Sequence, residues 1–138
     1  MILVDSNVLI DVINDEADWK AWSVDKIAHL SARNRLSVNE IVVAEVAPSM
    51  GSLQKFYQEI GRLDISFQPL SDVAAFAAGE AFLAYRMARR LEGKTILADF
   101  FIGGHARILG ATILTRDPRF YRSYFPEVPL IVPEQSGL

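Results

Sequence analysis

Short apolar segments alternate with amphipathic helical segments along this chain, and this alternation restricts the fold more than any other feature. Short strands are expected at residues 2–4, 36–38, 64–68, 111–114 and 130–132. Helices are expected from about residue 8 and over residues 19–32, 40–47, 52–63, 72–91, 96–109 and 119–124. Strands that alternate with helices predict an α/β fold, with a parallel sheet covered by helices on both faces.

Capping residues set several of the expected helix ends. Asn39 is a suitable N-cap for the helix at 40–47, and Pro48 is expected to stop that helix. Gly93 is expected to end the long helix at 72–91, and Gly110 the helix at 96–109.

Composition places the chain among ordinary globular proteins. Its 138 residues fit a single domain over 1–138 with a sizeable core. No apolar stretch reaches the length of a membrane span, and no secretory leader is visible, so we expect a cytoplasmic protein without membrane association. The absence of cysteine excludes disulfides and thiolate metal sites. A net charge of −3 means that any nucleic-acid contact must come from local basic patches.

Two carboxylates follow predicted strands. Asp5 interrupts the apolar run "MILVDSNVLI", and Asp117 follows the strand at 111–114. Ligands of parallel α/β sheets lie beyond the carboxyl ends of the strands, so these two acids are expected to meet at one sheet edge. Taken singly, Asp5 could instead cap the following helix, and Asp117 before Pro118 could simply form a turn.

Two more carboxylates stand alone on apolar helices. Glu45 lies in "IVVAEVA" and Asp99 in "ILADFFIGGHA". Each could pair with an arginine, but buried like charges that gather in one place need a cation. Carboxylate oxygens suit Mg²⁺ or Mn²⁺, and a metal-bound water near a phosphate gives hydrolysis. Asp5, Glu45, Asp99 and Asp117 are therefore the predicted metal-binding and catalytic residues.

Other polar residues in these segments have simpler interpretations. Glu40 shares a helix with Glu45 but points away from it, and its place in the first turn favours a structural role. Asp11 is expected to be a solvated surface residue. His105 has no partner at metal-ligand spacing and is expected on a helix surface.

The basic residues form two groups. Arg86, Arg89, Arg90 and Lys94 near the end of the long helix could simply favour the helix dipole. Arg116, Arg119 and Arg122 alternate with Phe120, Tyr121 and Tyr124 beside the fourth acid. Arginines among aromatic residues suit phosphate contact and base stacking on single-stranded RNA, or an acidic segment of an inhibitor. The Trp19/Trp22 pair could be core or a partner surface.

Four motifs together resemble the PIN-domain family, and more narrowly the VapC-type toxins of bacterial toxin–antitoxin pairs. They are "VDSNVLI", the lone helical glutamate in "VNEIVVAEV", "ILADFFIGGHA" and "ILTRDPRFYRSYFP". The resemblance implies a three-layer α/β/α fold around a mostly parallel sheet, with metal-binding acids at Asp5, Glu45, Asp99 and Asp117. Asn7 and Thr115 match the polar helpers of the family. Gly103-Gly104 stand where alanines are more usual, which indicates close packing.

The same resemblance implies a Mg²⁺- or Mn²⁺-dependent endoribonuclease that acts on RNA, is inhibited by a cognate antitoxin and is commonly dimeric. Two alternatives stay open at this point. One is a PIN-like adaptor that has lost catalysis, against which the four carboxylates argue. The other is a receiver-like phospho-acceptor domain, which fits poorly because Ser6 and Asn7, rather than a second acid, follow Asp5.

Overall fold

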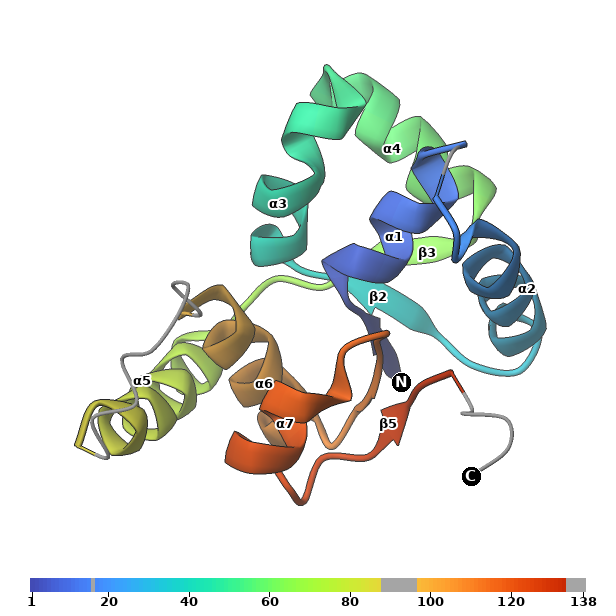
Figure 1. The fold of residues 1–138 in the computed structure, drawn as a ribbon. Coiled ribbons are helices and arrows are strands. Elements are labelled where there is room, and N and C mark those ends of the chain that lie inside the picture. Colours follow the sequence, from blue (N-terminus) through green and yellow to red (C-terminus); the bar gives the residue numbers. More distant parts are fainter. Residues whose placement is uncertain (16, 88–96, 134–138) are drawn as a thin grey trace.

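The computed structural model describes residues 1–15, 17–87 and 97–133. A sheet of short parallel strands runs through its centre in the order β3-β2-β1-β4-β5 (Figure 1). The strands are β1 (Ile2–Val4), β2 (Leu36–Val38), β3 (Ile65–Phe67), β4 (Thr112–Leu114) and β5 (Leu130–Ile131). The predicted α/β class, three-layer arrangement and parallel sheet are thus confirmed.

The helices lie where the apolar spacing predicted them, with shifted ends. They are α1 (Ser6–Ile13), α2 (Lys20–Ser31), α3 (Glu40–Met50), α4 (Leu53–Arg62), α5 (Asp72–Met87), α6 (Leu97–Leu109) and α7 (Pro118–Tyr124). The predicted end of the long helix at Gly93 and three of its basic residues, Arg89, Arg90 and Lys94, lie outside the described residues. No helix in the described ranges has the length and apolar character needed to cross a bilayer.

Two helix boundaries differ from the sequence prediction. Pro48 does not stop α3, which continues to Met50. Pro48 sits in the last turn, where its missing N–H removes only one helical hydrogen bond, and Gly51 ends the helix at a φ of 86°. Helix α1 begins at Ser6, earlier than predicted, because Asp5 is its N-cap.

The strand order changes direction at β1. The chain moves outward from β1 to β2 and β3, and then returns to the other side of β1 to form β4 and β5. With right-handed crossovers, this reversal places the helices of the two halves on opposite faces. Figure 1 shows α1 to α4 on one side of the sheet and α6 and α7 on the other. The crevice between the ends of β1 and β4 is therefore the topological switch point, where such sheets bind ligands.

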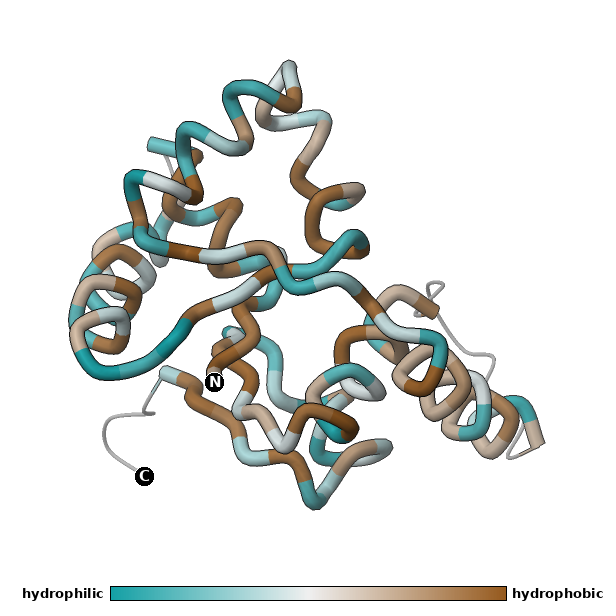
Figure 2. The backbone as a smooth tube through the Cα atoms, turned by 180° about the vertical axis from the view of Figure 1, so that it is seen from behind, coloured by the Kyte–Doolittle hydropathy of each residue, from teal (hydrophilic) through white to brown (hydrophobic). Residues whose placement is uncertain are grey.

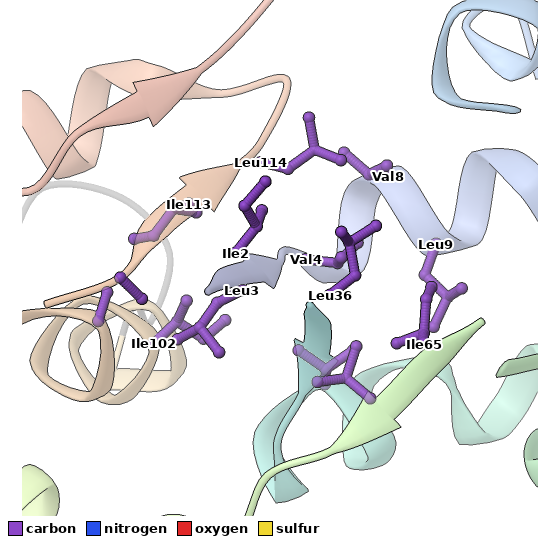
Figure 3. Packing of buried hydrophobic residues seen from close by; sticks show 14 of the residues in the cluster. Ile2, Leu3, Val4, Val8, Leu9, Leu36, Ile65, Ile102, Ile113 and Leu114 are labelled. Carbon is purple, nitrogen blue, oxygen red and sulfur yellow. The ribbon is translucent and has the colours of Figure 1, made fainter. Parts of the chain in front are cut away.

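Aliphatic side chains from both faces of the sheet form the core. Leu3 on the central strand lies beside Ile102 of α6, whereas Val8 of α1 lies beside Leu114 (Figure 3). Hydrophobic segments run through the centre of the molecule, and the turn between α2 and β2 is strongly hydrophilic (Figure 2). Burial of this apolar surface is the main contribution to folding.

Helix α6 packs unusually close to its neighbours at the double glycine, as its sequence indicated. A Cβ on Gly104 would lie 2.8 Å from the Ala78 nitrogen and 3.0 Å from the Ala74 oxygen of α5. A Cβ on Gly103 would lie 2.3 Å from the Phe125 ring. The glycines let α6, which carries Asp99, sit directly against α5 and the segment after α7.

Candidate active site

The site forms where β1 and β4 end. The Asp5 amide donates to the Leu114 carbonyl at 2.9 Å, so the first residue after β1 lies beside the last residue of β4. This contact brings Asp5 next to Thr115, although the two residues are 110 positions apart. Both are buried, with 4% and 0% of their surface exposed.

The Asp5 carboxylate is held on both oxygens. Oδ1 accepts from the Ser6 amide at 2.7 Å, which caps α1, and Oδ2 accepts from the Thr115 hydroxyl at 2.8 Å and the Tyr121 hydroxyl at 2.9 Å. Burial raises the pKa of Asp5, and the hydrogen bonds from Thr115, Tyr121 and Ser6 oppose this rise. Asp5 is therefore both the helix cap and the central acid of the site.

Asn7 and Thr115 organise the loop after β4, in the helper positions predicted for them. The Asn7 side-chain amide donates to Thr115 Oγ1 at 3.2 Å, and its oxygen accepts from the Arg116 amide at 3.1 Å. Thr115 Oγ1 also accepts from the Asp117 amide at 3.1 Å. Because the single Thr115 proton goes to Asp5, these bonds fix the loop relative to that carboxylate.

Glu45 reaches the site from α3 through Ser6. The Ser6 hydroxyl donates to Glu45 Oε1 at 3.0 Å and lies 3.5 Å from Asp5 Oδ1. Much of the Glu45 side chain is exposed, but desolvation at its carboxylate, and then the charge of Asp5, raise its pKa. Ser6 was not among the predicted residues, although its position directly after Asp5 at a helix start was the available signal.

Asp99 is electrostatically coupled to the other three acids. Its pKa is raised to about 7, first by burial and then by the charges of Asp5, Glu45 and Asp117. An acid whose pKa responds to three other carboxylates lies near each of them. The structure therefore brings all four predicted acids to the same edge of the sheet, from β1, α3, α6 and the β4–α7 loop.

The chemistry of this donor set fits a hard divalent cation, which would relieve the repulsion between the carboxylates. Among the described residues, no three His, Asp or Glu side chains are already grouped closely enough to hold an ion. Glu45 and Asp117 are exposed, and Asp117 makes no side-chain capping bond to α7. Their exposure distinguishes these two acids from Asp5, which is 4% exposed.

The three predicted arginines lie in different surroundings. Arg119 and Arg122 are exposed on α7, as an interaction surface requires. Arg116 instead pairs with Asp11 of α1 at 2.5 and 3.0 Å, and its guanidinium lies 5.7 Å from the centre of the Trp19 ring. The prediction that Asp11 is solvated was wrong, because only 3% of it is exposed.

Tyr121 was predicted among aromatic residues able to stack on RNA, and the structure corrects this. Only 1% of Tyr121 is exposed, and its hydroxyl points to Asp5. The helical spacing from Asp117 through Tyr121 to the buried Phe125 was the signal that this side of α7 faces inward. Phe120 and Tyr124 are partly buried and pack against Phe100.

His105 lies in the interior, not on the helix surface as predicted. It is 1% exposed, and its Nδ1 accepts from the Asn39 side-chain amide at 3.1 Å. Asn39 caps α3 through its oxygen, as predicted, so this contact connects α6 to the start of α3. Glu40, on the first turn, accepts from the Leu70 amide at 2.8 Å, which agrees with its predicted structural role.

Solved structures of similar fold include a toxin–antitoxin complex from Klebsiella pneumoniae and the three structures that follow. A chain of VapBC2 from Rickettsia felis, in a complex bound to a promoter DNA fragment, has a TM-score of 0.73 at 21% identity, covering 97% of this chain and 100% of that one. FitAcB from Neisseria gonorrhoeae has a TM-score of 0.68 at 18% identity, and the match covers 95% of this chain and 96% of that one. VapC20 of Mycobacterium tuberculosis, a toxin that cleaves the sarcin–ricin loop, has a TM-score of 0.62 at 17% identity. This match covers 94% of this chain and 99% of that one.

No curated protein sequence matches significantly. The model of the PIN domain family, however, matches residues 2–126, from the first strand to just beyond α7. That span includes all four acids and every element that positions them. The chain belongs to the PIN domain family.

Proposed function

We propose that this protein is a Mg²⁺- or Mn²⁺-dependent endoribonuclease and the toxin of a type II toxin–antitoxin pair. The observation that carries the proposal is the coupling of Asp99 to Asp5, Glu45 and Asp117 at the switch point of the sheet. Family membership removes the receiver-like alternative, and four convergent carboxylates argue against an inactive adaptor.

Each residue has a defined task in this proposal. Asp5, Glu45, Asp99 and Asp117 would hold the cation, whose chemistry would be to polarise the scissile phosphate and activate a water molecule. Asp99, whose pKa is raised to about 7, is partly protonated near neutral pH and would release this proton when the site binds the cation. Attack by water on phosphorus, with departure of the 3′ oxygen, leaves a 5′-phosphate and a 3′-hydroxyl.

The proposed partners follow from exposed residues and from the related complexes. Arg119 and Arg122 would contact RNA phosphates or the antitoxin near the strand ends. Helix α5 carries exposed apolar side chains, including Phe76 at 72% exposure and Met87 at 75%. Such a surface suits contact with a second copy of the chain, which supports a homodimer. The structures from Rickettsia felis and Neisseria gonorrhoeae are of VapBC and FitAB type, which supports a cognate antitoxin. A cytoplasmic location is part of the same proposal.

Cleavage of single-stranded RNA by the purified protein tests the proposal. Cleavage should require Mg²⁺ or Mn²⁺ and stop in EDTA, and the variants Asp5→Asn and Asp99→Asn should be inactive. Asp25→Asn, an exposed acid on α2, is the matched control and should cleave normally. Undiminished cleavage in EDTA would refute the metal-dependent mechanism.

Thermal unfolding gives a second test that does not depend on finding the right RNA. A cation at about 100 times its dissociation constant stabilises the parent by roughly 2.7 kcal/mol. Asp5→Asn should gain far less from the same addition. Equal gains would show that Asp5 does not hold the cation.

A further inference from the structure

We propose that Tyr121 is a positioning residue of the site: its hydroxyl fixes the orientation of Asp5 and places α7 relative to that carboxylate. This inference rests on the proposed function. The hydroxyl donates to Asp5 Oδ2 at 2.9 Å from a residue 116 positions away in the chain. It is the contact through which α7 reaches the central acid.

The two Asp5 oxygens have different surroundings. Oδ2 receives both hydroxyl protons, from Thr115 and Tyr121, so its lone pairs are occupied. Oδ1 receives the Ser6 amide and lies on the side where the Ser6 hydroxyl contacts Glu45. Oδ2 is therefore the anchored oxygen, and Oδ1 is the oxygen presented toward the other acids.

Tyr121 is suited to remain a donor. Its side chain is 1% exposed, and its hydroxyl has the buried Asp5 carboxylate as its acceptor. A buried hydroxyl that donates to Asp5 Oδ2 gives this oxygen a fixed partner.

The same hydrogen bond also fixes α7. This helix spans only Pro118–Tyr124, with Tyr121 buried and Arg119 and Arg122 exposed on its other side. A short helix anchored at its buried residue holds its exposed arginines at a set distance from Asp5. Tyr121 thus connects the carboxylate cluster to the surface proposed to meet RNA.

Tyr121→Phe tests the inference, with Tyr85→Phe as the matched control. Tyr85 is also buried, at 6% exposure, but its ring packs against Phe100 and Tyr124, and Asp5 accepts no hydrogen bond from it. Mn²⁺ binding is measured without RNA, from the electron paramagnetic resonance signal of the free ion. Loss of a partner that orients a metal ligand typically weakens binding roughly tenfold or more, and we expect this for Tyr121→Phe and no change for Tyr85→Phe.

RNA cleavage as a function of Mn²⁺ concentration supplies the second readout. If Tyr121 acts by orienting Asp5, activity of Tyr121→Phe should be low at limiting Mn²⁺ and should largely recover at saturating Mn²⁺. Parent-like Mn²⁺ affinity together with a lowered Tm would show that Tyr121 only stabilises the fold and would overturn the inference. A parent protein that neither binds Mn²⁺ nor cleaves RNA would instead overturn the proposed function.

Discussion

Arg116 and Asp11 form a two-point ion pair that fastens the loop after β4 to α1. Arg116 Nε and Nη2 contact the two Asp11 oxygens at 2.5 and 3.0 Å, and the Ser23 hydroxyl donates to the same carboxylate at 2.9 Å. The Arg116 amide is bonded to Asn7 as well. While paired with Asp11, Arg116 could contact RNA or an antitoxin only through its remaining guanidinium N–H groups.

Asp11→Asn should destabilise the protein. The substitution leaves the partly buried Arg116 guanidinium without its counter-charge, and removal of one partner from a buried pair is costly. Because the Arg116 side chain is 27% exposed, we expect a loss of about 2 kcal/mol, below the range for fully buried pairs. Urea unfolding of the parent and of Asp11→Asn measures this loss in the free energy of unfolding.

The matched control for this variant is Asp15→Asn. Asp15 pairs with Lys20 on the surface, and its side chain is 92% exposed. Solvent screens such pairs, so stability should hardly change. Equal effects of the two substitutions would show that the Asp11–Arg116 pair contributes no more than a surface pair.

Gly104→Ala and Gly79→Ala should act in opposite directions. Alanine at position 104 would press its Cβ against the α5 backbone, and overpacking of this kind costs about 1–3 kcal/mol. Gly79 lies within α5, where an added Cβ would meet no atom within 4 Å, so alanine there should stabilise by roughly 0.5–1 kcal/mol. Thermal melts compare the Tm of the two variants with that of the parent. A raised Tm in both variants would contradict the close contact between α6 and α5 at Gly104.

Without metal, the protein should lose stability as the pH rises from about 4 to about 7. Asp99 has a pKa of about 7 in the folded protein against 3.8 ordinarily, so over this range the folded chain keeps a proton that the unfolded chain has released. Because Asp99 is partly exposed and screened, we expect a loss on the order of 2 kcal/mol. The raised pKa values of Asp5 and Glu45 act in the same direction.

Thermal melts in EDTA at a series of pH values measure this dependence. Asp99→Asn should flatten the pH profile and be more stable than the parent at pH 8. A parent whose stability rises with pH over the same range would show that Asp99 is not a protonated group in the free protein.

Arg119→Ala should weaken RNA binding in a salt-dependent way. Each phosphate contact to a single strand contributes roughly 0.7 to the slope of log affinity against log salt, and the slope should fall by about that amount. Binding is measured in EDTA to prevent cleavage. Arg62→Ala on α4, an exposed arginine paired with Glu59, should leave the slope unchanged. An unchanged slope for Arg119→Ala would remove this residue from the RNA surface.

The parallel sheet could be predicted from the sequence, and the four acids could be singled out as candidates, for a physical reason. Buried parallel strands are continuous apolar runs, so Asp5 stands out at the end of such a run. Asp99 stands out in the same way, as a lone carboxylate among the apolar residues of α6. The spacing of Gly103 and Gly104 within a helix indicated close packing in the same local way.

The contacts that failed prediction depend on residues far apart in the chain. Asp11 is recognisable as an interior residue only beside Arg116, which is 105 positions away, and His105 only beside Asn39, 66 positions away. From the neighbouring sequence alone, Asp11 and His105 are both expected to be ordinary helix-surface residues. The prediction for Tyr121 was wrong because the arginines on either side of it favoured a surface position, whereas its helical spacing favoured a buried one.

The separation of Asp5 from Thr115 and Tyr121 in the chain also determines when during synthesis the proposed site is complete. Central strand β1 is synthesised first, but its neighbour β4 and the hydroxyls that orient Asp5 arrive only after 110 and 116 further residues. Chains grow at about 5–20 residues per second, and pairing of such distant strands is intrinsically slow. On the proposed function, a growing or truncated chain carries an incomplete carboxylate site, so ribonuclease activity begins only after synthesis has passed α7.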